Sequence, residues 1–144
     1  MNYLLDTCVI SELTKKNPNP NVIQWVAKAE ESRLFISVLT IGEIYKGIAK
    51  LPKSKKKEKL YEWVKYDLKE RFSERILDFD LQSAAIWGKV QAQSELSGKA
   101  MPAIDGLIAA TGIAYNLTVV TRNTTDMEVS EVALFNPWEI RDTP

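Results

Sequence analysis

Histidine is absent from this 144-residue sequence, and cysteine occurs once, at Cys8. Without histidine, the chain cannot use an imidazole base, which excludes Ser–His and Cys–His mechanisms and histidine-dependent nucleases. A single cysteine excludes an intrachain disulfide bond and a zinc site built from several cysteines. Any bound metal must therefore have oxygen ligands, which is the chemistry that suits Mg²⁺ or Mn²⁺.

Long apolar runs are also missing, because no stretch approaches the ~20 residues that a membrane-spanning helix needs. The N-terminal segment is short and reaches the acidic Asp6 at once, which is unlike a signal peptide. We therefore expect a cytoplasmic protein that does not enter a membrane. The 19 basic residues balance the 19 acidic ones, so contact with nucleic acid would require local patches rather than overall charge.

Short apolar runs alternate with helical patterns along the chain. Strands are expected within residues 3–5, 34–37, 76–79, 117–121 and 132–135. Helices are expected over 7–13, from Pro20, over 40–49, over 54–72, over 81–96 and over 103–115. Thr7 is the expected cap of the first helix and Asp80 the expected N-cap of the helix over 81–96, which ends before Ser97-Gly98-Lys99. This alternation predicts one α/β domain, residues 1–144, with a mainly parallel sheet covered on both faces.

Four carboxylates fall at one predicted edge of this sheet. Asp6 ends the first strand, and Asp126 follows the strand that ends at Thr121. Glu43 lies early in the helix after the second strand, and Asp105 lies in the first turn of the helix that leads into the strand at 117–121. Because parallel sheets place ligands at the carboxyl ends of their strands, we expect the four side chains to meet.

Such a cluster is unfavourable by itself, since crowded carboxylates repel one another and their pKa values rise. A divalent cation removes this repulsion, activates a water molecule and offsets charge on a phosphodiester. Each residue also has an ordinary explanation when taken alone: Asp6 as a helix N-cap, Glu43 as a solvated helix residue, Asp105 as a partner of the helix dipole, and Asp126 as a turn residue. The prediction of a metal site therefore depends on the shared edge.

The carboxylates lie in residues 3–13, 37–44, 102–111 and 117–126, and these segments together resemble the PIN-domain family, especially the VapC- and FitB-like toxins of bacterial toxin–antitoxin pairs. Asn136-Pro137-Trp138-Glu139 also fits this branch. The resemblance implies a three-layer α/β/α sandwich with a mainly parallel sheet. It also implies Mg²⁺- or Mn²⁺-dependent cleavage of RNA at Asp6, Glu43, Asp105 and Asp126, with support from Thr7, Thr121 and Asn123.

The same resemblance implies two protein partners: a small antitoxin whose tail blocks the acidic cleft, and a second copy of the chain in a homodimer. Two positions depart from the family pattern. Cys8 stands where the family commonly has Asn, a supporting group, so the change concerns fine positioning more than activity. Met127 replaces a frequent Phe, which is a conservative apolar change.

Positive charge near the site is expected from Arg122, as a possible contact to an RNA phosphate. A structural ion pair of Arg122 with Asp126 or Glu128 is its alternative. The lysines between Lys53 and Lys59 are interpreted as a solvated helix start in preference to a guide for RNA.

Two other functions remain open. One is a catalytically weak binding module for RNA or protein with the same fold, which the four intact carboxylates disfavour. The other is a receiver-like signalling domain. It is disfavoured because Thr7 and Cys8 stand where a second acidic residue is required, and Arg122 stands where a lysine is required.

Overall fold

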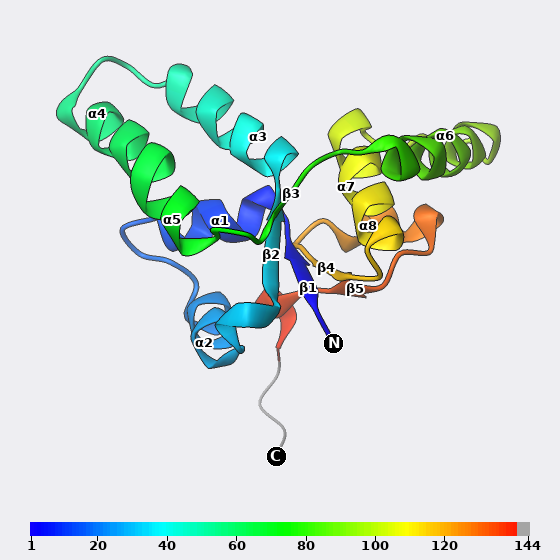
Figure 1. The fold of residues 1–144 in the computed structure, drawn as a ribbon, viewed down its shortest axis with the longest axis horizontal. Coiled ribbons are helices and arrows are strands. Elements are labelled where there is room, and N and C mark those ends of the chain that lie inside the picture. The colour runs from blue at the N-terminus through cyan, green and yellow to red at the C-terminus, as the bar shows by residue number, and fades with distance from the viewer. Residues whose placement is uncertain (141–144) are drawn as a thin grey trace.

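A five-stranded parallel sheet forms the centre of the structure, a computed structural model that describes residues 1–140 (Figure 1). Its strands lie in the order β3-β2-β1-β4-β5, and the four neighbouring pairs are all parallel. The strands are β1 (Tyr3–Leu5), β2 (Leu34–Ser37), β3 (Ile76–Leu77), β4 (Thr118–Val120) and β5 (Leu134–Phe135). The predicted α/β class with a parallel sheet is confirmed.

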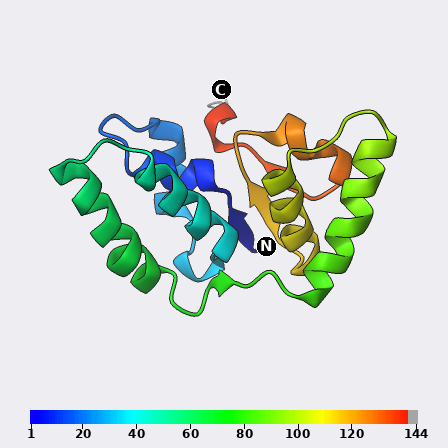
Figure 2. The same cartoon turned by 90° about the horizontal axis from the view of Figure 1, so that it is seen from above.

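Helices cover both faces of the sheet, which makes the three layers of an α/β/α sandwich (Figures 1 and 2). One face carries α1 (Thr7–Leu13), α2 (Pro20–Lys28), α3 (Val38–Ala49), α4 (Lys55–Glu62), the π-helical turn η2 (Trp63–Leu68) and α5 (Lys69–Arg71). The other carries α6 (Leu81–Leu96), α7 (Ala103–Ala114) and α8 (Thr124–Met127). The remaining elements are the 3-10 turns η1 (Glu31–Arg33), η3 (Glu128–Ser130) and η4 (Pro137–Glu139).

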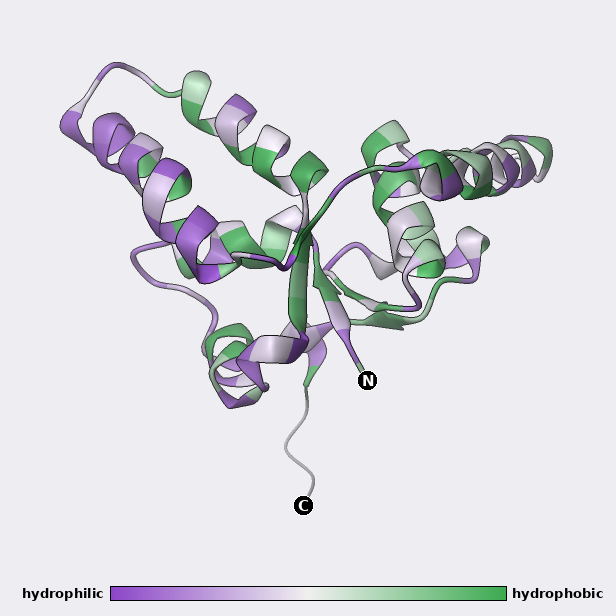
Figure 3. Ribbon diagram, in the orientation of Figure 1, coloured by the Kyte–Doolittle hydropathy of each residue, from purple (hydrophilic) through white to green (hydrophobic). Residues whose placement is uncertain are grey.

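Alternating strand residues build the two halves of the core. Leu5 and Val120 pack with Val9 and other residues of the α1–α5 face, whereas Leu4 and Val119 pack with residues of α7. Successive side chains of a strand point to opposite faces, so a strand buried on both faces reads as one continuous apolar run. Figure 3 shows the hydrophobic strands at the centre and the hydrophilic α4 at the periphery.

Two helix starts differ from the predicted ones. Asp6, not Thr7, is the N-cap of α1, and its side chain accepts a hydrogen bond from the backbone N–H of Thr7. The helix α3 begins at Val38, two residues before the predicted start at Thr40, because the side chain of Ser37 caps it. Both caps lie directly at a strand end, so the chain passes from strand to helix without a loop.

The helix expected from Ser54 to Phe72 is interrupted by the π-helical turn η2. Its buried residues Val64, Leu68 and Phe72 are spaced four apart. This spacing exceeds the 3.6 residues of an α-helical turn, so the residues would drift around a regular helix. A wider turn keeps them on the core side, which explains the irregular apolar pattern of this segment.

The carboxyl ends of β1, β2 and β4 lie at one edge of the sheet, where Asp6, Ser37 and Thr121 are found. Figure 1 shows α3 and α7 rising on either side of this edge. Across residues 1–140, no helix has the length and apolar character needed to cross a membrane. The assignment of residues 1–144 to a single domain stays a prediction, and its last four residues lie outside the described part.

Candidate active site

Four acidic residues from four elements meet at the carboxyl edge of the sheet. Asp6 follows β1, Glu43 lies on α3, Asp105 lies in the first turn of α7, and Asp126 lies in α8. Burial, followed by the negative charges of Asp6, Asp126 and Glu43, raises the pKa of Asp105 to about 6. The three other carboxylates are thus close enough to repel the charge on Asp105, and the structure places the four around one edge of the sheet.

Asp6 is the most buried and the most firmly held of the four, with 4% of its surface exposed. Its Oδ1 accepts a hydrogen bond of 2.8 Å from the backbone N–H of Thr7, and its Oδ2 accepts one of 2.8 Å from the hydroxyl of Thr121. Burial raises the pKa of Asp6, although these hydrogen bonds act in the opposite direction. Its carboxylate therefore has a fixed orientation before any ligand arrives.

Glu43 is oriented by Thr7, whose hydroxyl donates a hydrogen bond of 2.5 Å to Glu43 Oε1. Thr7 thus contacts two carboxylates, Asp6 through its backbone N–H and Glu43 through its side chain. Its position as the first residue of α1 makes this possible, because an N-terminal helix residue has a free backbone N–H. The structure places Thr7 where the resemblance puts a supporting residue.

Thr121 connects Asp6 to the loop that follows β4. Its hydroxyl donates to Asp6 and accepts a hydrogen bond of 3.0 Å from the backbone N–H of Asn123. The side chain of Asn123 makes no capping hydrogen bond to α8, so its visible role at the site comes from its backbone. This detail could not be read from the residue type.

Cys8 also reaches this network. Its Sγ lies 3.8 Å from Asp6 Oδ2 and 3.6 Å from Thr121 Oγ1, and it accepts the backbone N–H of Arg122 at 3.5 Å. Burial and the charge of Asp6 raise the pKa of the Cys8 thiol, which therefore stays protonated and can donate. Sulfur hydrogen bonds are weak, so the thiol at this supporting position orients Asp6 less firmly than an amide would.

Arg122 lies next to the acidic edge, but its guanidinium group is positioned by an aromatic ring. It stacks over Trp138 of η4, 5.6 Å from the ring centre. Among residues 1–140 the ion pairs do not include one from Arg122 to Asp126 or Glu128, so that alternative is wrong. The exposed charge of Arg122 is still available to a phosphate.

Within the Lys53–Lys59 cluster, one lysine has a structural role. The Lys57 ammonium donates to the backbone carbonyls of Ala49 and Leu51, at the end of α3. A cation at a helix C-terminus is favoured by the helix dipole and satisfies carbonyls that lack partners within the helix. This contact agrees with a structural interpretation of Lys57.

The donor set fits a hard divalent cation that retains water ligands. No lysine or arginine forms an ion pair with Asp6, Glu43, Asp105 or Asp126 in the part of the chain that the structure describes. In the same residues, no three acidic, histidine or cysteine side chains converge closely enough to enclose an ion alone. Oxygen donors with uncompensated charge are the ligand type that suits Mg²⁺, which usually keeps several of its waters.

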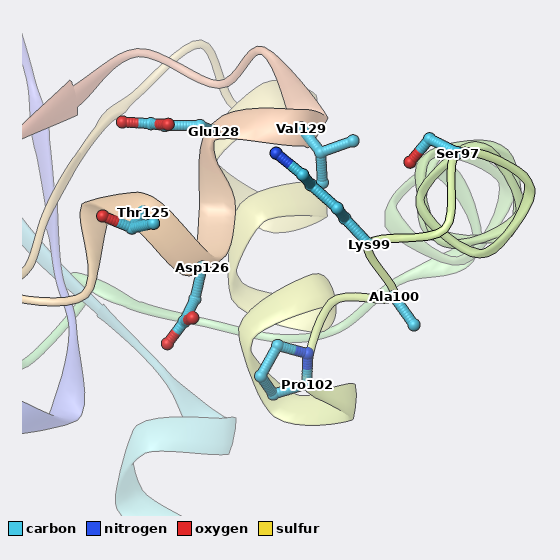
Figure 4. Close-up of a pocket in the computed structure, with 8 residues that line it drawn as sticks. All are labelled: Ser97, Lys99, Ala100, Pro102, Thr125, Asp126, Glu128 and Val129. Carbon is cyan, nitrogen blue, oxygen red and sulfur yellow. The ribbon is translucent and has the colours of Figure 1, made fainter.

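Lys99 is a residue near the site that the sequence did not single out. It lines a pocket of about 670 Å³ that also has Asp126 in its wall (Figure 4). The only signal in the sequence was the helix stop Ser97-Gly98-Lys99, which indicates a turn but not what the turn faces.

Comparisons with known proteins agree with this geometry. A model of the PIN domain matches residues 3–131. Toxin FitB of Neisseria gonorrhoeae is 39% identical over 135 residues, which cover 94% of this chain and 97% of FitB. VapC ribonuclease Y4jK of Sinorhizobium fredii is 34% identical over 136 residues, 94% of this chain and 97% of that protein. The structure of FitAB bound to the IR36 DNA fragment contains a chain with a TM-score of 0.91 and 37% identity, with 97% of this chain and 98% of that chain covered.

Proposed function

Because this chain belongs to the PIN-domain family, in the branch of the FitB and VapC toxins, we propose that it is a metal-dependent endoribonuclease and the toxin of a toxin–antitoxin pair. The observation that carries the proposal is that four elements place Asp6, Glu43, Asp105 and Asp126 at one edge of the sheet, where burial and the other three charges raise the pKa of Asp105. Uncompensated negative charge costs folding free energy, so a protein retains such a cluster where the charges have a use.

We assign the first metal to Asp6, Glu43 and Asp105, which would hold it directly or through water, and Asp126 to completing the site or holding a second, weaker metal. A bound Mg²⁺ or Mn²⁺ would supply an activated water and offset charge on the phosphodiester. Thr7 and Thr121 hold Asp6 in one orientation through both of its oxygens, and Thr7 also holds Glu43. Asp105 must lose a proton that it retains up to about pH 6 before it can act as a ligand.

We also propose three partners: RNA as the substrate, a cognate antitoxin as the inhibitor, and a second copy of the chain in a homodimer. The likeness to the FitAB assembly supports a protein partner. The exposed guanidinium of Arg122 beside the acidic edge supports a phosphate contact. The proposed location is the cytoplasm, where an RNA substrate would be met.

The deciding experiment is cleavage of total cellular RNA by purified protein, free of any bound inhibitor, in Mg²⁺, in Mn²⁺ and in EDTA. The Asp105→Asn variant is measured beside it, because it removes one charge with almost no change of shape. Asp67→Asn is the matched control: Asp67 is exposed on η2, outside the acidic site. Circular dichroism and thermal melting establish that each variant is folded.

We expect metal-dependent cleavage by the wild-type and Asp67→Asn proteins and none by folded Asp105→Asn. Sequencing the fragment ends then identifies the RNA target. Absence of cleavage by the wild-type protein in either metal would replace the proposal with the non-cleaving binding module. Cleavage that persists in EDTA or in Asp105→Asn would contradict the assigned site.

A further inference from the structure

The pocket beside Asp126 lies between two segments that are distant in sequence. Ser97, Lys99 and Pro102 come from the connection between α6 and α7, and Thr125, Asp126 and Glu128 come from α8 and η3. Its volume of about 670 Å³ falls within the range of small-molecule sites, which is ~300–1,000 Å³. Since Asp126 belongs to the acidic site and to the pocket wall, a ligand in the pocket would adjoin the proposed reaction centre.

The α6–α7 wall is held rigidly by backbone hydrogen bonds. The end of α6 forms a Schellman motif, in which the N–H of Gly98 bonds to the carbonyl of Glu95 and the N–H of Lys99 bonds to that of Ser94. Gly98 has a φ of 80°, a left-handed conformation that glycine adopts without strain. The backbone of Lys99 is therefore fixed at the mouth of the pocket.

Side chains of α6 hold the rest of this connection. The hydroxyl of the buried Ser94 accepts the backbone N–H of Met101 at 3.1 Å, and the side-chain amide of Gln91 donates to the carbonyl of Met101 at 2.9 Å. With both backbone groups of Met101 bonded, the wall cannot detach from α6 without breaking these contacts. The pocket is thus a formed feature of the fold rather than a gap beside a loose loop.

Lys99 carries the positive charge of this pocket. Figure 4 shows its side chain extending across the pocket toward Val129, while the carboxylates of Asp126 and Glu128 point away from it. Within residues 1–140, no ion pair includes Lys99. The pocket therefore combines an unpaired ammonium group, the carboxylates of Asp126 and Glu128, the hydroxyls of Ser97 and Thr125, and the apolar atoms of Pro102 and Val129.

We infer that this pocket binds the nucleotide adjacent to the scissile phosphodiester of an RNA strand, with Lys99 contacting a backbone phosphate; this inference rests on the proposed function. A phosphate next to four carboxylates is repelled, and Lys99 supplies an opposing charge at the right edge of the site. The hydroxyls can bond to phosphate or ribose oxygens, and the apolar atoms offer surface to a sugar or base.

An inhibitory peptide is the other macromolecule that the pocket faces, but its charge is unfavourable there. A peptide that covers four carboxylates would pair them with its own cations, and Lys99 would repel these cations. An RNA strand brings phosphates on both sides of the cleaved bond, so a cation just outside the acidic site attracts it. The Lys99 ammonium thus favours RNA as the occupant, because the carboxylates of Asp126 and Glu128 extend away from it and leave it unpaired among the described residues (Figure 4).

The test measures RNA binding separately from cleavage. Binding of a short, fluorescein-labelled single-stranded RNA of mixed sequence is followed by anisotropy in Mg²⁺, over a series of salt concentrations. All proteins in this assay carry Asp105→Asn, so the RNA stays intact, and Lys99→Ala, Lys99→Arg and Lys89→Ala are compared. Lys89 is an exposed lysine of α6 that does not line the pocket, so Lys89→Ala matches the loss of charge.

Lys99→Ala is expected to weaken RNA binding about tenfold, because it removes one charge-assisted contact. The slope of log affinity against log salt should fall by about 0.7, the value for one phosphate on a single strand. Lys99→Arg and Lys89→Ala should keep the parent affinity and slope within about twofold. In the cleaving protein, Lys99→Ala should raise KM for RNA and leave kcat nearly unchanged.

The inference is overturned if Lys99→Ala changes neither the affinity nor the salt slope, or if Lys89→Ala changes both to the same extent. A Lys99→Ala variant that binds RNA normally but loses affinity for an inhibitory peptide would assign the pocket to the protein partner instead. Failure of the wild-type protein to cleave RNA would refute the proposed function, while the anisotropy series would still decide whether Lys99 contacts RNA.

Discussion

The two sides of the acidic site hold their carboxylates in different ways. On the α1–α3 side, Asp6 and Glu43 accept hydrogen bonds from Thr7 and Thr121. On the α7–α8 side, within the described residues, the side-chain hydrogen bonds include none to the carboxylate of Asp105 or of Asp126. The carboxylates of the first side are oriented by hydrogen-bond donors of the protein, whereas the described residues offer no such donors to those of the second side.

This difference indicates how the site is assembled. Asp6 and Glu43 form a prepared half that keeps its geometry without a cation, since threonine donors replace the contacts that a metal would make. Asp105 and Asp126 lack such donors, so a cation is the partner that would fix their orientation. Removing a threonine donor should therefore disturb the orientation of Asp6 or Glu43. Neutralising Asp105 or Asp126 should instead relieve charge repulsion in the metal-free protein.

The largest effect is expected from Asp6→Asn. Asparagine keeps the N-cap of α1, because Asn and Asp cap helices about equally well, but it removes the charge of a proposed metal ligand. We expect loss of metal-dependent RNA cleavage on the order of a thousandfold, with a melting temperature close to that of the wild type. A folded variant that cleaves RNA at the wild-type rate would remove Asp6 from the site.

A smaller effect is expected from Thr121→Val, which deletes the hydroxyl that holds Asp6 Oδ2. Loss of a group that orients a metal ligand typically costs about 10- to 100-fold in metal affinity or activity. A buried carboxylate oxygen without its donor should also lower the free energy of unfolding by about 1–3 kcal/mol. Mn²⁺ titration, RNA cleavage and urea denaturation measure the three quantities.

Thr111→Val is the matched control for this prediction. Thr111 is another fully buried threonine, but its hydroxyl donates to the carbonyl of Leu107 within α7 and reaches no carboxylate. Its replacement should change stability with little effect on cleavage. Equal losses of activity in the two variants would show that Thr121 acts through general stability and not through Asp6.

Much of this arrangement was predictable because it follows from local pattern. Apolar runs identified the strands, and strands that alternate with helices imply a parallel sheet whose carboxyl ends share one edge. The position of Asp6 after the run Tyr3–Leu5 therefore predicted where its side chain would lie. The repulsion felt by Asp105 agrees with the expectation that the four carboxylates meet.

The contacts that orient the carboxylates were not predictable, because they join residues far apart in the chain. Thr7 and Glu43 are 36 positions apart, and Asp6 and Thr121 are 115 apart. Such bonds depend on how α3 and β4 are set against α1, which the periodicity of one segment does not report. The pocket at Lys99 was missed for the same reason, since its walls meet only after α6 packs against η3.

A third prediction concerns Asp105, in the half of the site without threonine donors, and uses the pH dependence of the free energy of unfolding. The ordinary pKa of an Asp carboxyl is 3.8, and that of Asp105 is about 6 in the fold. Between these values the folded protein binds more protons than the unfolded chain, so this group makes the free energy of unfolding fall as pH rises. Above about pH 7 the penalty is complete, and Asp105→Asn should then stabilise the metal-free protein by about 1 kcal/mol, a figure discounted for solvent screening.

Urea denaturation in EDTA measures this difference, with the wild type and Asp105→Asn compared at about pH 4 and about pH 8. The difference in stability should be much smaller at the lower pH, where Asp105 keeps its proton in the folded protein and the unfolded chain has lost only part of its own. Added Mg²⁺ should stabilise the wild type more than the variant at the higher pH. A variant that is no more stable than the wild type at the higher pH would mean that the four charges do not interact.

The smallest effect is expected at Cys8, whose thiol lies beside Asp6 in the half of the site that threonine donors orient. The thiol contacts Asp6 Oδ2 at 3.8 Å and accepts the N–H of Arg122 at 3.5 Å, both as weak sulfur hydrogen bonds. Cys8→Asn would offer an amide donor and a carbonyl acceptor to the same groups, and Cys8→Ala would offer neither. We expect Mn²⁺ affinity and the rate of RNA cleavage to rise about threefold with Asn and to fall about threefold with Ala.

Since α1 is already capped by Asp6, neither change should alter helix content by circular dichroism, so an effect would report on the orientation of Asp6. If Cys8→Ala matched the wild type in both assays, the backbone of Thr7 and the hydroxyl of Thr121 would suffice to orient Asp6.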